Sequence, residues 1–87
     1  MTTRPTASQL EALLRAAFAP TELAVQDDSH LHAGHSGARE GSHFSVRIRS
    51  PRFAGLAPVA RHRLVYDALG EWMRHGIHAL AIDARAP

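Results

Sequence analysis

Histidine is the residue type in this chain whose spacing offers chemistry. Three of the seven histidines, His30, His32 and His35, fall within six residues, and a fourth, His78, lies near the end of the chain. Imidazole is a common metal ligand, and loops often carry such ligands on a rigid scaffold. The spacing therefore indicates a metal or cluster site. An adventitious Zn²⁺ or Ni²⁺ site and an ordinary polar loop are the alternatives.

The other histidines have simpler interpretations. His78 itself begins an apolar segment, where a half-buried structural histidine is the alternative to a ligand. For His43 and His62 we expect structural hydrogen bonding. His75 lies near the end of an expected helix, where the helix dipole favours a basic group.

Composition limits the class of protein. The chain has 87 residues, 45% of them hydrophobic, which predicts one domain over residues 1–87 with disorder only at residues 1–5. It has no cysteine and no apolar run near the roughly 20 residues that a membrane helix needs. The first residues also lack the apolar core of a signal peptide. We therefore expect a cytoplasmic protein, with no membrane contact.

The first half of the chain predicts a helix and two strands. Thr6 and Gln9 have the spacing of a capping box, and apolar residues including Leu13 then repeat at helical intervals as far as Phe18. Residues 22–28 and 43–50 alternate as strands do. The segment 29–41 between them is long for a hairpin loop, which is typical of a functional loop.

The second half predicts one long helix and a last strand. Proline at position 58 suits the first turn of a helix, and Gly76 suits its end. Residues 77–84 follow as a strand, with His78, Leu80 and Ile82 expected on one face. The order helix, strand, strand, helix, strand predicts an α+β two-layer sandwich. Its three-stranded mixed sheet has helices on one face.

Five separated stretches resemble the BolA family and cover the chain from about Leu10 to Pro87. They are DS at 28–29, SHFSV at 42–46, FAGL at 53–56, RHRLVY at 61–66 and HALAI at 78–82. The resemblance implies a fold similar to a class II KH domain. It also implies a partner of monothiol glutaredoxins, with which the family shares a bridging 2Fe-2S cluster for cluster trafficking or iron regulation.

The resemblance also implies which residues take part. The late cluster ligand of the family matches His78, and its loop ligand matches His32, with His35 as the near alternative. We expect Arg61, His62, Ala79 and Leu80 to form the docking face. A chain without cysteine can offer only imidazoles, so a partner cysteine and glutathione would supply the remaining ligands. Alone, the chain is expected to bind no cofactor and to be a monomer or weak homodimer.

Nucleic-acid binding is the alternative function. The net charge is +2, and all ten basic residues are arginine, which suits phosphate contact, although coding bias gives the same count. Some BolA-like proteins are described as transcription regulators, so the family also allows DNA as a partner. The residues that would form a basic surface are Arg47, Arg49, Arg52, Arg61 and Arg63.

An enzyme is not expected. The chain has no cysteine nucleophile and no serine motif on a strand–helix elbow. Asp27 and Asp28 are adjacent at a strand end, so their carboxylates should point apart, and Asp28-Ser29 should form an Asx-type turn.

Overall fold

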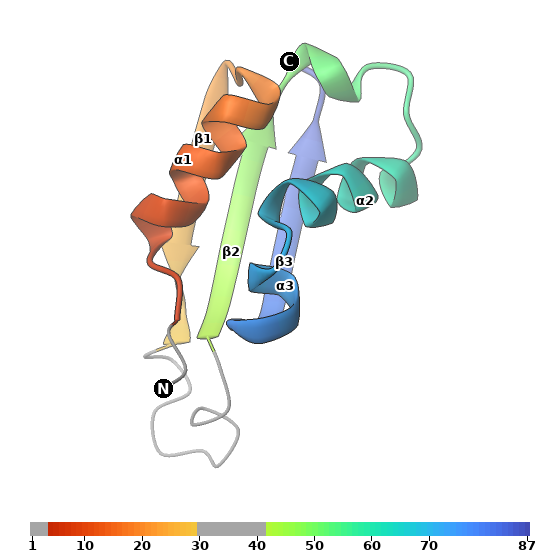
Figure 1. The fold of residues 1–87 in the computed structure, drawn as a ribbon. Coiled ribbons are helices and arrows are strands. Elements are labelled where there is room, and N and C mark those ends of the chain that lie inside the picture. Colours follow the sequence, from red (N-terminus) through yellow and green to blue (C-terminus); the bar gives the residue numbers. More distant parts are fainter. Residues whose placement is uncertain (1–3, 30–41) are drawn as a thin grey trace.

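A three-stranded sheet with helices on one side forms the protein (Figure 1). The structure is a computed structural model that describes residues 4–29 and 42–87. Strand β2 lies in the centre, antiparallel to β1 and parallel to β3. The predicted α+β two-layer class is therefore confirmed. The elements are α1 (Ala7–Phe18), β1 (Glu22–Asp27), β2 (Ser42–Arg49), η3 (Pro51–Phe53), α2 (Pro58–Leu69), α3 (Trp72–His75) and β3 (Ile77–Arg85).

Helix α1 begins at the predicted capping box. The backbone N–H of Gln9 donates to Thr6 Oγ1 at 3.1 Å, and the Thr6 N–H donates to Gln9 Oε1 at 2.9 Å, so two otherwise unpaired donors are satisfied. Leu10 and Leu14 are fully buried by the sheet. The placement of Leu13 on the core face is wrong, because its side chain stays 38% exposed at the edge of the apolar stripe.

The core lies between the helices and one face of the sheet. Along β2, Phe44, Val46 and Ile48 point to the helices and are at most 2% exposed, as the alternation predicts. Helix α1 covers the β1 side of the sheet, while α2 and α3 lie over β3 (Figure 1). The opposite face of the sheet is not covered by any described element, and it carries the polar residues of the strands.

The prediction of one helix from Pro58 to Gly76 is wrong. Helix α2 ends at Leu69 because Gly70 adopts φ 57°, a conformation that glycine reaches without strain, and the short helix α3 follows. Gly70 itself was the sequence signal for this break. Helices α1 and α2 have 12 residues each, and no helix in the described part of the chain is long and apolar enough to cross a membrane.

The chain before α1 packs against the turn that leads into β3. Pro5 is buried, while the expected disorder of the first residues stays a prediction. A Cβ atom built on Gly76 would lie 2.7 Å from Pro5 Cδ and 2.9 Å from Trp72 Cε3. Glycine at position 76 therefore allows the first segment, α3 and the start of β3 to meet.

Candidate functional site

His78 lies at an irregular point of strand β3. Ser42 pairs with Ile77 and His43 pairs with Ala79, so His78 is an extra residue, as in a β-bulge. The bulge changes which side each residue faces. Ile77 is 8% exposed and belongs to the core, while His78 is exposed. The expectation that His78 shares a face with Leu80 and Ile82 is therefore wrong, since only the latter two pack against the core.

His43 is the neighbour of His78 on the open side of the sheet. The two ring centroids are 5.1 Å apart, and the ring planes are tilted by 54°. His43 is half-buried on β2, opposite in direction to Phe44. Sequence reasoning gave His43 only a structural role. The alternation of β2 already pointed its side chain outward, but the contact with His78 depends on the bulge.

The chain segment before the loop is attached to His43 by hydrogen bonds. The Asp28 N–H donates to the His43 carbonyl oxygen at 2.7 Å, and the His43 N–H donates to Ser29 Oγ at 3.1 Å. The Asp28 carboxylate accepts a hydrogen bond from Ser45 Oγ. These contacts fix residues 28 and 29 beside the histidine pair, at the point where the described chain stops before residue 30.

The two aspartates at the end of β1 have separate partners. Asp27 Oδ1 accepts from the Ser29 N–H at 2.9 Å, so the Asx-type turn begins at Asp27 rather than at Asp28 as predicted. Asp28 instead bonds Ser45 on the neighbouring strand. The printed hydrogen bonds of the two carboxylates therefore go to different residues, Ser29 and Ser45.

A shallow hollow on the open face of the sheet adjoins His43. It has a volume of about 280 Å³. Its floor is made of small residues of β3, Ala79 and Ala81, and its sides carry the hydroxyl of Ser45 and the carboxylate of Asp28. Water-sized groups or part of a partner molecule can therefore enter next to the histidine pair.

The loop histidines lie outside the described residues. His32 and His35, the predicted loop ligands, belong to residues 30–41 together with His30. Among the described residues, no group of three or more His, Cys, Asp or Glu side chains could hold a metal ion. The predicted pairing of His78 with a loop histidine therefore stays a prediction.

The predicted docking residues occupy two elements. Arg61 and His62 are half-buried in the first turns of α2, and Arg61 Nε is buried with no hydrogen-bond partner among residues 4–29 and 42–87. Ala79 is exposed directly after His78, whereas Leu80 points to the other side and packs against the core. Ala79 therefore adjoins the histidine pair on the open face of the sheet.

The arginines proposed for nucleic acid do not form one surface. Arg47 and Arg49 lie on the open face of the sheet, while Arg61 and Arg63 lie on α2, on the helix side. Arg52, in η3, donates to the Ala17 carbonyl oxygen at 3.4 Å. The five arginines are therefore spread over both sides of the sheet.

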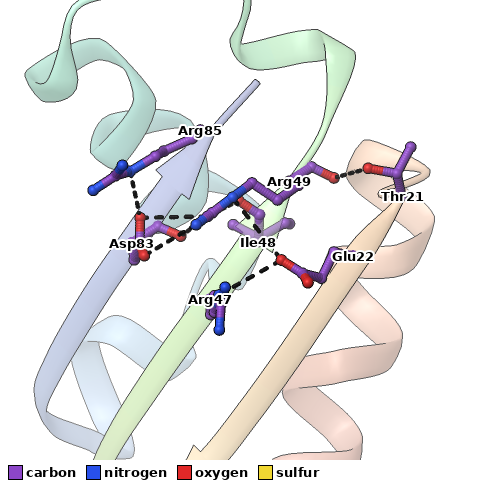
Figure 2. A network of polar contacts seen from close by, with 7 residues as sticks. All are labelled: Thr21, Glu22, Arg47, Ile48, Arg49, Asp83 and Arg85. Atoms are coloured by element: carbon purple, nitrogen blue, oxygen red, sulfur yellow. Dashed lines mark hydrogen bonds and ion pairs between the residues drawn. The ribbon is translucent and has the colours of Figure 1, made fainter. Parts of the chain in front are cut away.

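Arg47 and Arg49 take part in a network of ion pairs at the far end of the open face (Figure 2). Arg49 Nη2 lies 3.2 Å from Asp83 Oδ2, and its side chain is only 17% exposed. Arg47 Nε lies 3.5 Å from Glu22 Oε2, and Arg85 Nε lies 2.9 Å from Asp83 Oδ1. The network already matches these arginines with carboxylates of the same chain.

The network changes the acidity of Asp83. The hydrogen bond from the Arg49 guanidinium, helped by the charges of Arg49 and Arg85, holds the pKa of the Asp83 carboxyl below its usual range. Partial burial opposes this shift. Asp83 is therefore ionised whenever the protein is near neutral pH, and the Arg49–Asp83 ion pair is intact.

Comparison with known proteins identifies the family. The profile of the BolA-like protein family matches residues 14–87, so the chain belongs to this family and the resemblance is confirmed. "Protein BOLA1, chloroplastic" of Arabidopsis thaliana is 41% identical over 85 residues, which are 93% of this chain and 53% of that protein. The chain thus spans about half the length of this relative.

Two further comparisons bear on fold and function. The solved structure of BolA1 from Arabidopsis thaliana matches with a TM-score of 0.81 and 40% identity, covering 98% of this chain and 95% of that chain. A Haemophilus influenzae relative named "DNA-binding transcriptional regulator BolA" is 38% identical over 78 residues, which are 90% of this chain and 74% of that protein. The fold is thus that of the family over nearly the whole chain.

Proposed function

We propose that this chain is a non-enzymatic partner of a monothiol glutaredoxin and shares a bridging 2Fe-2S cluster with it, for cluster trafficking or iron regulation. The observation that carries the proposal is the exposure of His78 at the bulge of β3, in a chain that belongs to the BolA-like family. An exposed imidazole on a rigid strand is available to a metal centre that another protein brings.

The residues present fit such a group. Imidazole can replace thiolate on one iron of a 2Fe-2S cluster, and this chain contains seven histidines and no cysteine. The chain would hold the cluster through His78 and one loop histidine. When bound, the cluster supplies redox chemistry or is itself the cargo. The remaining ligands would be a cysteine of the glutaredoxin and glutathione.

Chain connectivity supports His32 as the loop ligand. Ser29 is fixed beside His43, which contacts His78. His32 is three residues further along the chain, so its Cα lies at most about 11 Å from the Ser29 Cα, whereas six residues allow His35 about twice that range. Of the two predicted loop ligands, His32 therefore has the shorter chain connection to Ser29, and His35 remains the alternative.

The proposed docking residues lie on two elements, with Ala79 directly after His78 on β3 and with Arg61 and His62 on α2. Arg61 offers a buried Nε–H that has no acceptor in the described chain, and a carboxylate or carbonyl oxygen of a partner would satisfy it. His62 follows Arg61 on α2. Ala79 is exposed directly after His78, and its small side chain leaves the backbone there accessible to a partner. Leu80 supports this strand from the core side.

The test is a titration of this protein into a cluster-loaded monothiol glutaredoxin, followed by visible circular dichroism. We expect a new spectrum that saturates at one-to-one, and we expect His78→Ala and His32→Ala to abolish it. His75→Ala, an exposed histidine on α3, is the matched control and should leave the spectrum unchanged.

Two results would decide against this assignment. Retention of the new spectrum in His32→Ala with its loss in His35→Ala would transfer the loop ligand to His35. An unchanged spectrum in the double variant His32→Ala/His78→Ala would overturn the proposed cluster site.

DNA binding is the second candidate, because the Haemophilus influenzae relative carries that activity in its name. It predicts a Kd for duplex DNA that rises steeply with salt, since neutralised phosphates release counterions. Arg63→Ala, on exposed α2, should then weaken binding more than Arg47→Ala, whose guanidinium already pairs with Glu22. Binding without salt dependence, or none at all, would remove this candidate.

A further inference from the structure

We propose that a second copy of this chain docks on one exposed side of helix α2, where two copies form an antiparallel helix pair across a two-fold axis. This side, the α2 stripe, consists of Val59, Arg63, Tyr66, Asp67 and Gly70, the residue that ends the helix. Helix α2 lies on the helix side of the sheet, whereas His78 lies on the open side (Figure 1). Self-association through the α2 stripe is therefore separate from the cluster function and requires no glutaredoxin.

The α2 stripe lies on the side of the helix that faces away from the core. Its members are spaced as i, i+4, i+7, i+8 and i+11, which places them on one side of a helix. All of them are exposed. Val65 and Ala68, on the opposite side of α2, pack in the core, so they fix which side of the helix points outward.

Two large apolar side chains are exposed on the α2 stripe. Val59 is 69% exposed and Tyr66 is 41% exposed, and among residues 4–29 and 42–87 only Leu13 on α1 is a further exposed side chain of this kind. Val59 and Tyr66 are about two helical turns apart on the same side, so one helix of a partner can cover both. Their burial in an interface would remove apolar surface from water, which favours association.

The charges of the α2 stripe are not matched within the described part of the chain. Arg63 and Asp67 form no ion pair there, whereas Glu22 and Asp83 on the sheet each pair with an arginine. Arg63 precedes Asp67 by one turn, which is the less favourable order for a pair within one helix. A second copy matches both charges, because Arg63 of each copy meets Asp67 of the other. A nucleic acid or an acidic protein surface would instead be repelled by Asp67.

One two-fold axis satisfies the whole α2 stripe. The midpoint between Arg63 and Tyr66 along the helix coincides with the midpoint between Val59 and Gly70. An axis through this point places Arg63 of each copy beside Tyr66 of the other, a cation–π contact, and within one residue of Asp67. The same axis places Val59 of each copy beside Gly70 of the other.

Gly70 leaves space for the second copy. A Cβ atom built on Gly70 would meet only the Asp67 carbonyl oxygen, at 4.0 Å, so the space above this glycine is open within the described chain. Val59 of the second copy can therefore approach the helix end closely. One short helix from each copy buries less than the roughly 1,200 Å² at the lower end of stable interfaces, so the dimer should be weak, with a Kd above about 10 µM.

The experiment is sedimentation equilibrium of the isolated full chain over a series from micromolar to millimolar protein. We expect a monomer–dimer equilibrium. Arg63→Asp and Asp67→Arg should each raise the dimer Kd at least about tenfold, because like charges then meet across the axis. An equimolar mixture of these two variants should associate again, since the carboxylates of one variant meet the guanidinium groups of the other. Only a surface that binds its own copy predicts this restoration.

Arg4→Asp is the matched control. Arg4 is exposed before α1, and its replacement changes the net charge as Arg63→Asp does, so the dimer Kd should stay unchanged. Far-ultraviolet circular dichroism checks that each variant is folded.

Three results would overturn the proposal: a protein that stays monomeric over the whole series, a dimer that survives both charge reversals, or a mixture of the two variants that does not associate. If the protein stays monomeric and Arg63→Asp weakens its binding to a monothiol glutaredoxin or to duplex DNA, the α2 stripe belongs to that partner instead. The sedimentation experiment contains no glutaredoxin and no cluster, so its failure leaves the cluster proposal to its own test.

Discussion

The two ends of the open sheet face are held in different ways. At one end, Arg49 and Asp83 lie 3.2 Å apart in a network in which opposite charges are matched within the chain. At the other end, two imidazoles contact each other at a bulge, and the close packing of Pro5, Gly76 and Trp72 supports the strand beneath. The comparison teaches that the charged end uses its polar groups for stability. At the histidine end, the imidazoles point toward solvent, and the packing of Pro5, Gly76 and Trp72 stabilises the strand that carries His78.

Among changes at glycines and polar residues, Gly76→Ala should have the largest effect on stability. The new Cβ would lie 2.7 Å from Pro5 Cδ and 2.9 Å from a Trp72 ring carbon, so buried groups must move. Overpacking of this kind costs about 1–3 kcal/mol of the free energy of unfolding, which urea denaturation would measure. Gly55→Ala is the control. It meets no atom within 4 Å, and its only cost comes from φ +77°.

A second change checks that the collision is the cause. Pro5→Ala removes the Cδ atom, so Gly76→Ala should destabilise this variant less than it destabilises the original protein. Equal losses in the two backgrounds would mean that Pro5 does not support the histidine end.

Arg49→Met should have the next largest effect. It removes the hydrogen bonds to Asp83 and to the Ile48 carbonyl oxygen. Hydrogen bonds to charged groups contribute about 1.5–3 kcal/mol. Water screens this pair because the Asp83 side chain is 43% exposed, so the expected loss is smaller than that of a fully buried pair. The measurement is urea denaturation at low salt.

Arg47→Met is the matched control for that change. The Arg47 side chain is 61% exposed and its ion pair with Glu22 is 3.5 Å long, so the loss should stay below about 0.5 kcal/mol. If both variants lost the same free energy, the charged end would not depend on the half-buried Arg49.

Asp83→Asn should have a smaller effect that depends on pH. The pKa of Asp83 is lower in the folded protein than in the unfolded chain, so its ionised form stabilises the fold. This contribution is complete above the unfolded pKa of about 3.9 and is lost as pH falls through the lower folded value. The stability difference between the original protein and Asp83→Asn should therefore be constant near neutral pH and shrink in acid. A difference that grows in acid would contradict it.

The smallest stability effect should come from His78→Asn. The side chain is exposed, so the free energy of unfolding should change by less than about 0.5 kcal/mol. Its neighbour Ile77 is 8% exposed, and Ile77→Ala should cost about 2–4 kcal/mol. A large loss in His78→Asn would mean that this histidine is structural, as the simpler interpretation of the sequence held.

Much of the fold was readable from local patterns. The capping box of α1 and the inward residues of β2 depend only on neighbouring residues, and both predictions are confirmed. The break at Gly70 was also local, but the apolar residues that continue into α3 hid it. Local patterns thus identified which elements exist more accurately than the residues at which they end.

The candidate site depended on contacts between distant parts of the chain. His43 and His78 meet because a bulge shifts the pairing of β2 with β3, and no pattern within either strand contains that shift. The scatter of the arginines has the same origin, since it depends on which side of the sheet each element lies. His32 and His35 lie outside the described residues, so their predicted role awaits the cluster titration.

The bulge at His78 also bears on how molecules of this protein meet. Within the described sheet β3 is an edge strand, and such an edge can add a strand of another chain. The bulge interrupts the regular spacing of backbone donors and acceptors at the start of β3, and Asp83 and Arg85 place charges near its end. The regular register of β3 begins only at Ala79, after the bulge. The irregularity that turns a histidine outward is thus also one of the features that discourage edge-to-edge pairing of sheets, together with the charges of Asp83 and Arg85.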